Sequence, residues 1–264
     1  MRLLVVAGEG ILPGEVVKGA RSQGYDVVVF NFSKKPIEAP QVFNFKIEDA
    51  GKALSTMETL SPDEAVMVGK VEHKIVFSSL FTKPSLLPLV RRLKGKKPME
   101  ILKTIGEIIE ERGVKLVSPL KFVPHLVFPR GELVGRFSQQ ELKEISRAYS
   151  LAKELARMDI GQAIAWKEGA VVAVEAMEGT DRMIRRAGEL VKDFTVVKVS
   201  RPSQDLRYDL PVVGPSTLEA MAEAGGKNLV FEAGKTIFLN PELSLDFARR
   251  RRIKIISWEE PENE

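Results

Sequence analysis

Apolar runs alternate with amphipathic segments along the first half of the chain. Residues 2–7, 27–30 and 65–68 are short runs rich in branched or aromatic apolar residues, as expected of buried strands. Residues 13–23 and 50–60 instead space their apolar side chains as a helix does. Strands that alternate with helices predict a mostly parallel sheet with helices on both faces. This half therefore indicates a Rossmann-like α/β domain.

A second α/β pattern begins after residues 131–135, where two glycines and a charge interrupt the apolar spacing. Ser138 to Glu141 has the sequence of a capping box and predicts the start of a helix of about twenty residues. Two apolar runs on either side of residues 167–169 predict a hairpin. Further helices are expected at 181–190, 216–224 and 241–250, and strands at 194–199, 229–231, 236–239 and 253–256. We therefore predict two domains, residues 1–134 and residues 135–264.

Composition limits the classes of protein that this chain can belong to. Its 264 residues are 44% hydrophobic, enough for two ordinary cores. Cysteine is absent, which excludes disulfides, a thiol nucleophile and thiolate metal ligands. A net charge of +4 is weak evidence for a nucleic acid partner, and we expect none. No apolar run approaches the ~20 residues of a spanning helix, so we expect a cytoplasmic protein, with peripheral membrane contact through basic runs such as 91–97 left open.

Two glycine-containing turns follow predicted strands of the first half. Gly8 and Gly10 lie between the first strand and the first helix, where backbone N–H groups can hold a phosphate. A purely structural turn is the alternative. Pro13 stands where the dinucleotide fingerprint has its third glycine, and Asn31 where it has an acid, so NAD is not favoured.

Gly69 and Lys70 follow the strand at residues 65–68. The carboxyl ends of strands in open α/β sheets border the crevice where ligands bind, so Lys70 is a candidate contact for an anion. The alternative is a surface lysine after a turn.

Five carboxylates lie at the ends of predicted segments in the second half. They are Glu175, Glu178, Asp181, Asp205 and Asp209. Oxygen anions of this kind are the ligands that Mg²⁺ prefers, and acids beside cations suit metal-assisted phosphate chemistry. For any one of them, a surface salt bridge is the alternative.

Three longer motifs stand out in this half of the chain, and the second and third contain these acids. They are L-A-R-M-D-I-G-Q ending at Gln162, V-A-V-E-A-M-E-G-T-D-R-M from Val172, and K-V-S-R-P-S-Q-D-L-R-Y-D-L-P-V-V-G from Lys198. Together they resemble the LpxI family, the UDP-2,3-diacylglucosamine pyrophosphatases of lipid A biosynthesis. The first half resembles the family more loosely, through A-G-x-G-x-L-P at residues 7–13 and V-G-K-V at residues 68–71. Glu9, where many members have glycine, and residues 72–74 depart from the family pattern.

The resemblance implies a fold and a reaction. The fold is a Rossmann-like domain joined to a second α/β domain peculiar to the family, with the ligand between them and a homodimer as the assembly. The reaction is attack of water on the α-phosphorus of an acylated UDP-sugar, which gives UMP and 2,3-diacylglucosamine 1-phosphate, known as lipid X. In the family it depends on a divalent ion, usually Mg²⁺.

The resemblance also implies roles for single residues. Asp209 is expected to be a metal ligand or the carboxylate that orients and deprotonates water, with Asp205 assisting it. Further metal ligands, or residues behind the ligands, are expected at Glu175, Glu178 and Asp181. Substrate contacts are expected at Gly8, Gly10, Gly69 and Lys70, phosphate contacts at Lys198, Gln204 and Arg207, and nucleotide or sugar contacts at Gln162 and Thr180. Residues 77–89 are our candidate for the groove that holds the acyl chains.

Two other functions are compatible with the sequence. A nucleotide or sugar-phosphate binding protein without catalysis would keep the glycine turn and give the acids structural roles. A dinucleotide oxidoreductase would have to bind NAD or FAD, which Pro13 and Asn31 do not favour.

Overall fold

The computed structural model describes residues 1–70, 87–93, 98–202 and 204–260. Contacts divide the chain into two compact units: unit 1 is Met1–Pro124 with Asp205–Asp209, and unit 2 is His125–Gln204 with Leu210–Glu264. The chain therefore passes between the units after Pro124, after Gln204 and after Asp209, whereas the sequence suggested one boundary at residues 134 and 135. Residues 77–86 of the candidate acyl groove lie outside the described residues.

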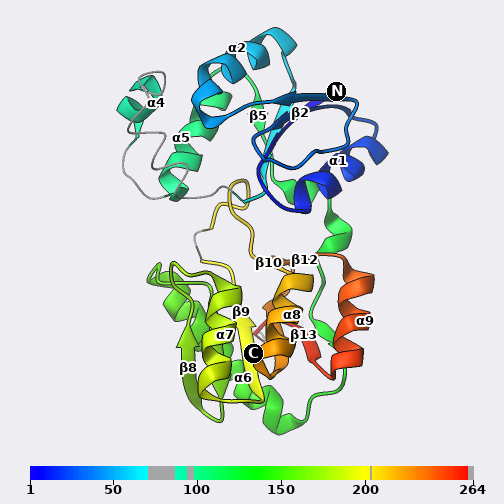
Figure 1. The fold of residues 1–264 in the computed structure, drawn as a ribbon, viewed down its shortest axis with the longest axis vertical. Coiled ribbons are helices and arrows are strands. Elements are labelled where there is room, and N and C mark those ends of the chain that lie inside the picture. Colours follow the sequence, from blue (N-terminus) through cyan, green and yellow to red (C-terminus); the bar gives the residue numbers. More distant parts are fainter. Residues whose placement is uncertain (71–86, 94–97, 203, 261–264) are drawn as a thin grey trace. The chain divides into compact units, whose positions relative to one another are not determined.

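Unit 1 contains a five-stranded parallel sheet with the order β3-β2-β1-β4-β5 (Figure 1). Its strands are β1 (Arg2–Ala7), β2 (Asp26–Asn31), β3 (Gln41–Asn44), β4 (Glu64–Val68) and β5 (Lys115–Leu116). Strand β1 pairs with β2 on one side and with β4 on the other, and Leu3, Val5 and Ala7 are fully buried. The strand order changes direction at β1 and β4, and open α/β sheets bind ligands beyond the carboxyl ends of such strands.

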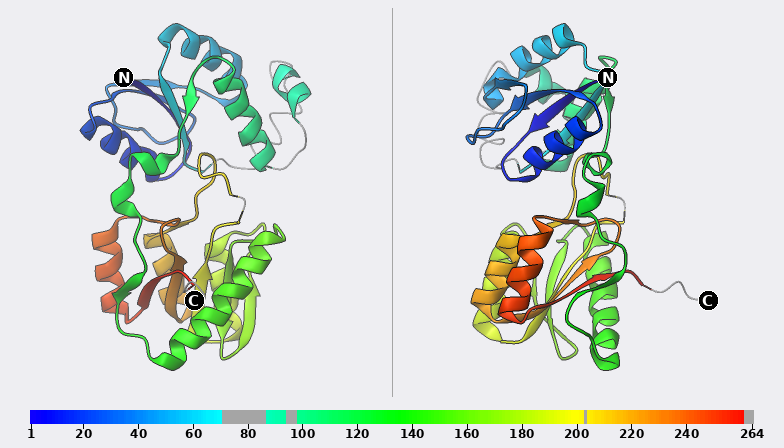
Figure 2. Two further views of the ribbon diagram at one scale, coloured as in Figure 1. Left: turned by 180° about the vertical axis from the view of Figure 1, so that it is seen from behind. Right: turned by 90° about the vertical axis from the view of Figure 1, so that its right-hand side faces the viewer.

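Helices cover this sheet, as the apolar spacing predicted. The helices against the sheet are α1 (Leu12–Ser22), α2 (Ala50–Leu60) and α5 (Pro98–Glu110), and the short helix α4 (Leu87–Arg92) lies beside α5 (Figure 2). Helix α1 buries Val16, Val17 and Ala20. Met57 of α2 and Ile109 of α5 belong to one core cluster with Leu4 and Phe30 of the sheet. The prediction of a parallel α/β sheet is confirmed, whereas β3 was not predicted.

Unit 2 contains a six-stranded mixed sheet with the order β6-β13-β11-β9-β7-β8. Its strands are β6 (Gly131–Val134), β7 (Ala163–Lys167), β8 (Ala170–Val174), β9 (Phe194–Lys198), β11 (Gly226–Glu232) and β13 (Lys254–Trp258). Strands β9, β11 and β13 are parallel, and the other three run antiparallel to their neighbours. The predicted hairpin is the pair β7–β8. Two short strands, β10 (Val212–Val213) and β12 (Ile237–Phe238), pair with each other.

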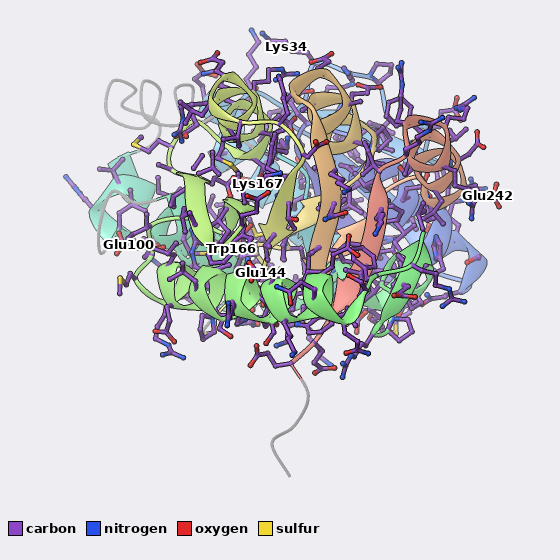
Figure 3. All side chains as sticks on the ribbon, turned by 90° about the horizontal axis from the view of Figure 1, so that it is seen from below. Lys34, Glu100, Glu144, Trp166, Lys167 and Glu242 are labelled. Atoms are coloured by element: carbon purple, nitrogen blue, oxygen red, sulfur yellow. The ribbon has the colours of Figure 1, made fainter. Side chains whose placement is uncertain are left out.

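Helices cover both faces of the unit 2 sheet. They are α6 (Gln139–Arg157), α7 (Thr180–Leu190), α8 (Pro215–Ala224) and α9 (Pro241–Arg251). Figure 3 shows α6 across one face and the other three helices on the opposite face. On the α6 face, the indole nitrogen of Trp166 donates to Glu144 at 3.0 Å. Within the part of the chain that the structure describes, no helix is both long and apolar enough to cross a membrane.

The start of α6 has the capping box that the sequence predicted. The Ser138 hydroxyl accepts from Glu141 N at 3.2 Å, and the Glu141 carboxylate accepts from Ser138 N at 2.8 Å. Glu141 also accepts from Lys254 Nζ at 2.7 Å. Burial opposes ionisation, but the hydrogen bonds from Lys254 and Ser138 prevail and lower the pKa of Glu141 to about 2.

Glu141→Gln is expected to lower the free energy of unfolding of unit 2 by about 1.5–3 kcal/mol at pH 7, the size of a hydrogen bond to a charged group. The folded pKa lies below the ordinary value of 4.5, so the difference from the wild type should shrink as the pH falls from 4.5 towards 2. Urea denaturation followed by tryptophan fluorescence measures this. Glu154→Gln, at an exposed ion pair with Arg157 on the same helix, is the control and should change stability by less than about 0.5 kcal/mol. A difference that persists unchanged at pH 3 would contradict the assignment.

Candidate functional site

The loops after β1 and β4 are paired with each other. Glu9 N donates to Lys70 O at 2.8 Å, Lys70 N donates to Glu9 O at 2.7 Å, and Gly8 N donates to Val68 O at 2.8 Å. A Cβ on Gly8 would lie 2.5 Å from Lys70 O, and one on Gly69 would lie 2.7 Å from the carbonyl carbon of Gly8. Gly8 and Gly69 are therefore required for the close approach of the two loops, and these three N–H groups bind protein carbonyls.

Gly10 is required for a different reason. Its φ of +116° is one that other residues rarely adopt, and a Cβ there would meet nothing within 4 Å. Helix α1 begins two residues later at Leu12, with Pro13 in its first turn. In the first turn of α1, Pro13 has no N–H group, and Gly14 N and Glu15 N donate to Ile11 O at 3.1 and 3.4 Å. The side chain of Lys70 is exposed.

Asn31, at the end of β2, organises the next loop. It is 1% exposed. Its side-chain nitrogen donates to Lys35 O and to Asn44 Oδ1, and its side-chain oxygen accepts from Ser33 N. Glu9 joins the same loop, because its carboxylate accepts from Lys34 N at 2.8 Å. Many members of the family have glycine at position 9, and in this chain the Glu9 side chain there binds the backbone of the loop that follows β2.

Five of the predicted site residues form a continuous polar network in unit 2. Gln162 Nε2 donates to Gln204 Oε1 at 3.0 Å, and Gln162 N donates to the Glu175 carboxylate at 3.3 Å. The Thr180 hydroxyl donates to Glu175 at 2.7 Å and accepts from Lys198 Nζ at 2.8 Å. The network lies at one end of the strands, where β7 begins and where β8 and β9 end.

Two glycines determine how the chain approaches this end of the strands. A Cβ on Gly161 would overlap the Glu175 carbonyl oxygen, so the chain before β7 can approach the end of β8 only without a side chain there. Gly179, with φ +82°, is the N-cap of α7. The sequence predicted a helix from residue 181, with Thr180 as its N-cap, and the observed helix begins one residue earlier. Thr180 is instead the first helical residue, and its buried hydroxyl faces Glu175 and Lys198.

The other predicted acids of unit 2 are not part of this network. Glu178 forms an ion pair with Arg186 at 2.6 Å, and the hydrogen bond from Arg186 lowers the pKa of Glu178. Asp181 lies in the first turn of α7 and is partly exposed. Across the described ranges, no three Asp, Glu or His side chains gather in a group that could hold a metal ion. The described carboxylates therefore do not fit a metal site as they stand.

The segment Asp205–Asp209 is a turn that belongs to unit 1. Asp205 accepts from Arg207 N and Nε at 3.0 Å and from Arg207 Nη2 at 2.8 Å, and these bonds lower the pKa of Asp205. Arg207 Nη1 also donates to Glu110 of α5 at 3.0 Å. Asp209 N donates to Asp205 O at 3.3 Å. Asp205, Arg207 and Asp209 thus lie in unit 1, while the other predicted acids lie in unit 2.

Glu232, at the end of β11, is a buried acid next to the predicted site residues that the sequence did not indicate. Its side chain is 3% exposed. It accepts from Ser200 N and Oγ at 2.7 Å, from Lys153 Nζ at 3.0 Å and from Lys235 Nζ at 2.9 Å. Burial alone would raise the pKa of Glu232, but the hydrogen bonds from Lys235, Ser200 and Lys153 lower it below its ordinary value. Ser200 begins the stretch that leads to Gln204 and Asp205, so Glu232 fixes the start of that stretch.

These features define a class of protein. One unit of the protein has a parallel sheet with the strand order of a Rossmann fold. The other unit has a mixed sheet with a network of glutamine, glutamate, threonine and lysine at one end of its strands. Sequence profiles of the LpxI N-terminal domain and the LpxI C-terminal domain match residues 2–126 and residues 129–256. The chain belongs to the LpxI family, and the resemblance seen in its motifs is confirmed.

Single proteins are similar to this chain to different extents. The UDP-2,3-diacylglucosamine pyrophosphatase LpxI of Caulobacter vibrioides is 28% identical over an alignment of 258 residues, which covers 91% of this chain and 91% of that protein. The solved structure of Bordetella bronchiseptica WbmG in complex with NAD covers 43% of this chain and 35% of its own, at 16% identity and a TM-score of 0.30. L-threonine dehydrogenase from Phytophthora infestans covers 58% of this chain and 49% of its own, at 12% identity and a TM-score of 0.30. Structural likenesses this small have no bearing on function.

Proposed function

We propose that this protein hydrolyses UDP-2,3-diacylglucosamine to UMP and 2,3-diacylglucosamine 1-phosphate, lipid X, in lipid A biosynthesis. The observation that supports this most is the relation to the Caulobacter vibrioides enzyme, at 28% identity over 91% of each chain. The family profiles add that both halves of the chain, rather than one, have the family pattern.

The reaction is a displacement at the α-phosphorus. A water oxygen forms a bond to this phosphorus, the bond to the bridging oxygen breaks, and the sugar phosphate leaves with that oxygen. Charge builds up on the phosphate oxygens during this step, so cations and N–H donors nearby lower the barrier. Lys198 suits this role, because its ammonium group is held at the end of β9 by the Thr180 hydroxyl, which Glu175 holds in turn.

Roles for the remaining residues are part of the proposal. Asp209, assisted by Asp205, orients the water and removes its proton. Phosphate oxygens are bound by Lys198, Gln204 and Arg207, and the nucleotide or sugar by Gln162 and Thr180. The loops at Gly8, Gly10, Gly69 and Lys70 face the diphosphate.

Dependence on Mg²⁺ or another divalent ion is a further expectation of the family, with Asp209, Glu175, Glu178 and Asp181 as the candidate ligands. Because the described carboxylates form no group that could hold an ion, the steps above are written for the residues of the chain alone. A homodimer, a cytoplasmic location and peripheral contact with the inner membrane surface also stay predictions.

Turnover in ¹⁸O-labelled water tests whether the substrate is hydrolysed and which phosphorus atom the water attacks. The purified protein should convert UDP-2,3-diacylglucosamine to UMP that contains one ¹⁸O atom and to lipid X that contains none, as measured by mass spectrometry. Treatment with EDTA followed by added Mg²⁺ should abolish and then restore turnover. Label in lipid X instead would place the attack on the β-phosphorus. Binding of the substrate without turnover, with and without Mg²⁺, would favour the non-catalytic binding protein.

A further inference from the structure

Tyr208 occupies the space beside a glycine of α5. A Cβ on Gly106 would lie 2.5 Å from both Cε1 and the hydroxyl oxygen of Tyr208. Tyr208 is partly buried and packs against the core cluster of unit 1 that contains Ile109 and Leu116. The absence of a side chain at position 106 is therefore what lets the tyrosine ring lie against the helix.

The residues on either side of Tyr208 are attached to unit 1 as well. Arg207 bridges Asp205 and Glu110, and its guanidinium carbon lies 5.2 Å from the centre of the Tyr208 ring. The Ser118 hydroxyl donates to Leu206 O at 2.9 Å. Three consecutive residues, 206–208, are thus held by α5 and by Ser118.

The chain on both sides of this segment is held by unit 2. Gln204 Oε1 accepts from Gln162 Nε2 and from Arg201 N, and Pro211 O accepts from Ile237 N at 2.9 Å. Between Gln204 and Leu210, which belong to unit 2, the segment Asp205–Asp209 belongs to unit 1. Asp209 follows Tyr208 directly and donates its N–H group to Asp205 O, so the contacts of Arg207 and Tyr208 with α5 restrain its position.

We propose that Tyr208 and Arg207 are positioning residues, which hold Asp209 in the place that the reaction requires by binding α5 at Gly106 and Glu110. In this arrangement a helix of the N-terminal domain fixes an acid that belongs to a motif of the C-terminal domain. The catalytic part of this inference rests on the proposed function, whereas the attachment of the segment to α5 does not.

Limited trypsin digestion of Gly106→Ala tests the attachment. Within residues 200–210 the basic residues are Arg201 and Arg207, and Pro202 blocks cleavage after Arg201. Cleavage after Arg207 therefore reports release of the segment. A methyl group forced into an occupied site should raise this cleavage rate about tenfold. Gly51→Ala on α2, where a Cβ meets nothing within 4 Å, is the control and should leave the rate unchanged.

Kinetics and a double variant separate positioning from simple stability. Gly106→Ala should lower kcat about 10–100-fold, the cost of a misplaced catalytic group, with KM and Tm close to those of the wild type. In a Tyr208→Ala background, Gly106→Ala should change neither the cleavage rate after Arg207 nor kcat any further. Wild-type cleavage after Arg207 in Gly106→Ala would overturn the attachment, and faster cleavage with normal kcat would overturn the positioning role. If the wild type itself shows no hydrolysis, the proposed function fails, and the digestion still decides the attachment.

Discussion

Asp209→Asn is expected to lower kcat for hydrolysis of UDP-2,3-diacylglucosamine by about 10²–10⁴-fold, the usual contribution of a positioned general base. Asparagine has the shape of aspartate but cannot take a proton from water or stabilise positive charge. KM should change little, because the phosphate and nucleotide contacts lie on other residues. Steady-state kinetics with the acylated UDP-sugar measure both constants.

Two checks make the Asp209 result specific. Asp246→Asn removes an exposed aspartate of α9 that is paired with Arg250, and its kcat should equal that of the wild type. The trypsin pattern of Asp209→Asn should also match the wild type, which would show that the segment Asp205–Asp209 remains in place. A near-normal kcat in Asp209→Asn would mean that another acid activates the water.

Elements with a strong local pattern could be predicted from the sequence. The β1 run and the capping box at Ser138 are examples, because apolar spacing and cap chemistry act within a few residues. Strand β3 was missed because Gln41–Asn44 has only two apolar residues, and its stability comes from β2, where Phe30 contacts Phe43 at a ring distance of 5.7 Å. Strand β6 was missed because it pairs with β13 through an irregular antiparallel register that no local pattern indicates.

The residues of the candidate site could be predicted from the sequence, but their contacts could not. The motifs identified Gln162, Glu175, Thr180, Lys198 and Gln204, which the structure joins by hydrogen bonds. Which of these residues bind each other could not be predicted, because each polar side chain can form hydrogen bonds with many others in the chain. The pairing of Arg207 with Glu110, 97 residues apart, depends on the tertiary fold alone. Gly106 was likewise overlooked, because a glycine within a helix gives no sign of the ring that it accommodates.

Glu232→Gln is expected to lower the free energy of unfolding of unit 2 by about 3–5 kcal/mol at pH 7, as when one partner of a buried ion pair is removed. The glutamine would leave Lys153 without its carboxylate, and its amide could not replace the bonds from both Ser200 and Lys235. Both tryptophans of the chain, Trp166 and Trp258, belong to unit 2, so fluorescence during urea denaturation reports this unit. The control Glu223→Gln, at an exposed ion pair with Arg185, should change stability by less than about 0.5 kcal/mol.

The pH dependence separates the charge of Glu232 from its shape. The folded pKa of Glu232 lies below its ordinary value of 4.5, so its stabilising contribution is complete above that value and is lost as the pH falls through the folded pKa. The stability difference between the wild type and Glu232→Gln should therefore be constant from pH 6 to pH 8 and become smaller below pH 4.5. A difference that stays the same down to the lowest pH at which unit 2 is folded would mean that packing, and not the carboxylate charge, holds Ser200 and the start of the stretch that leads to Asp209.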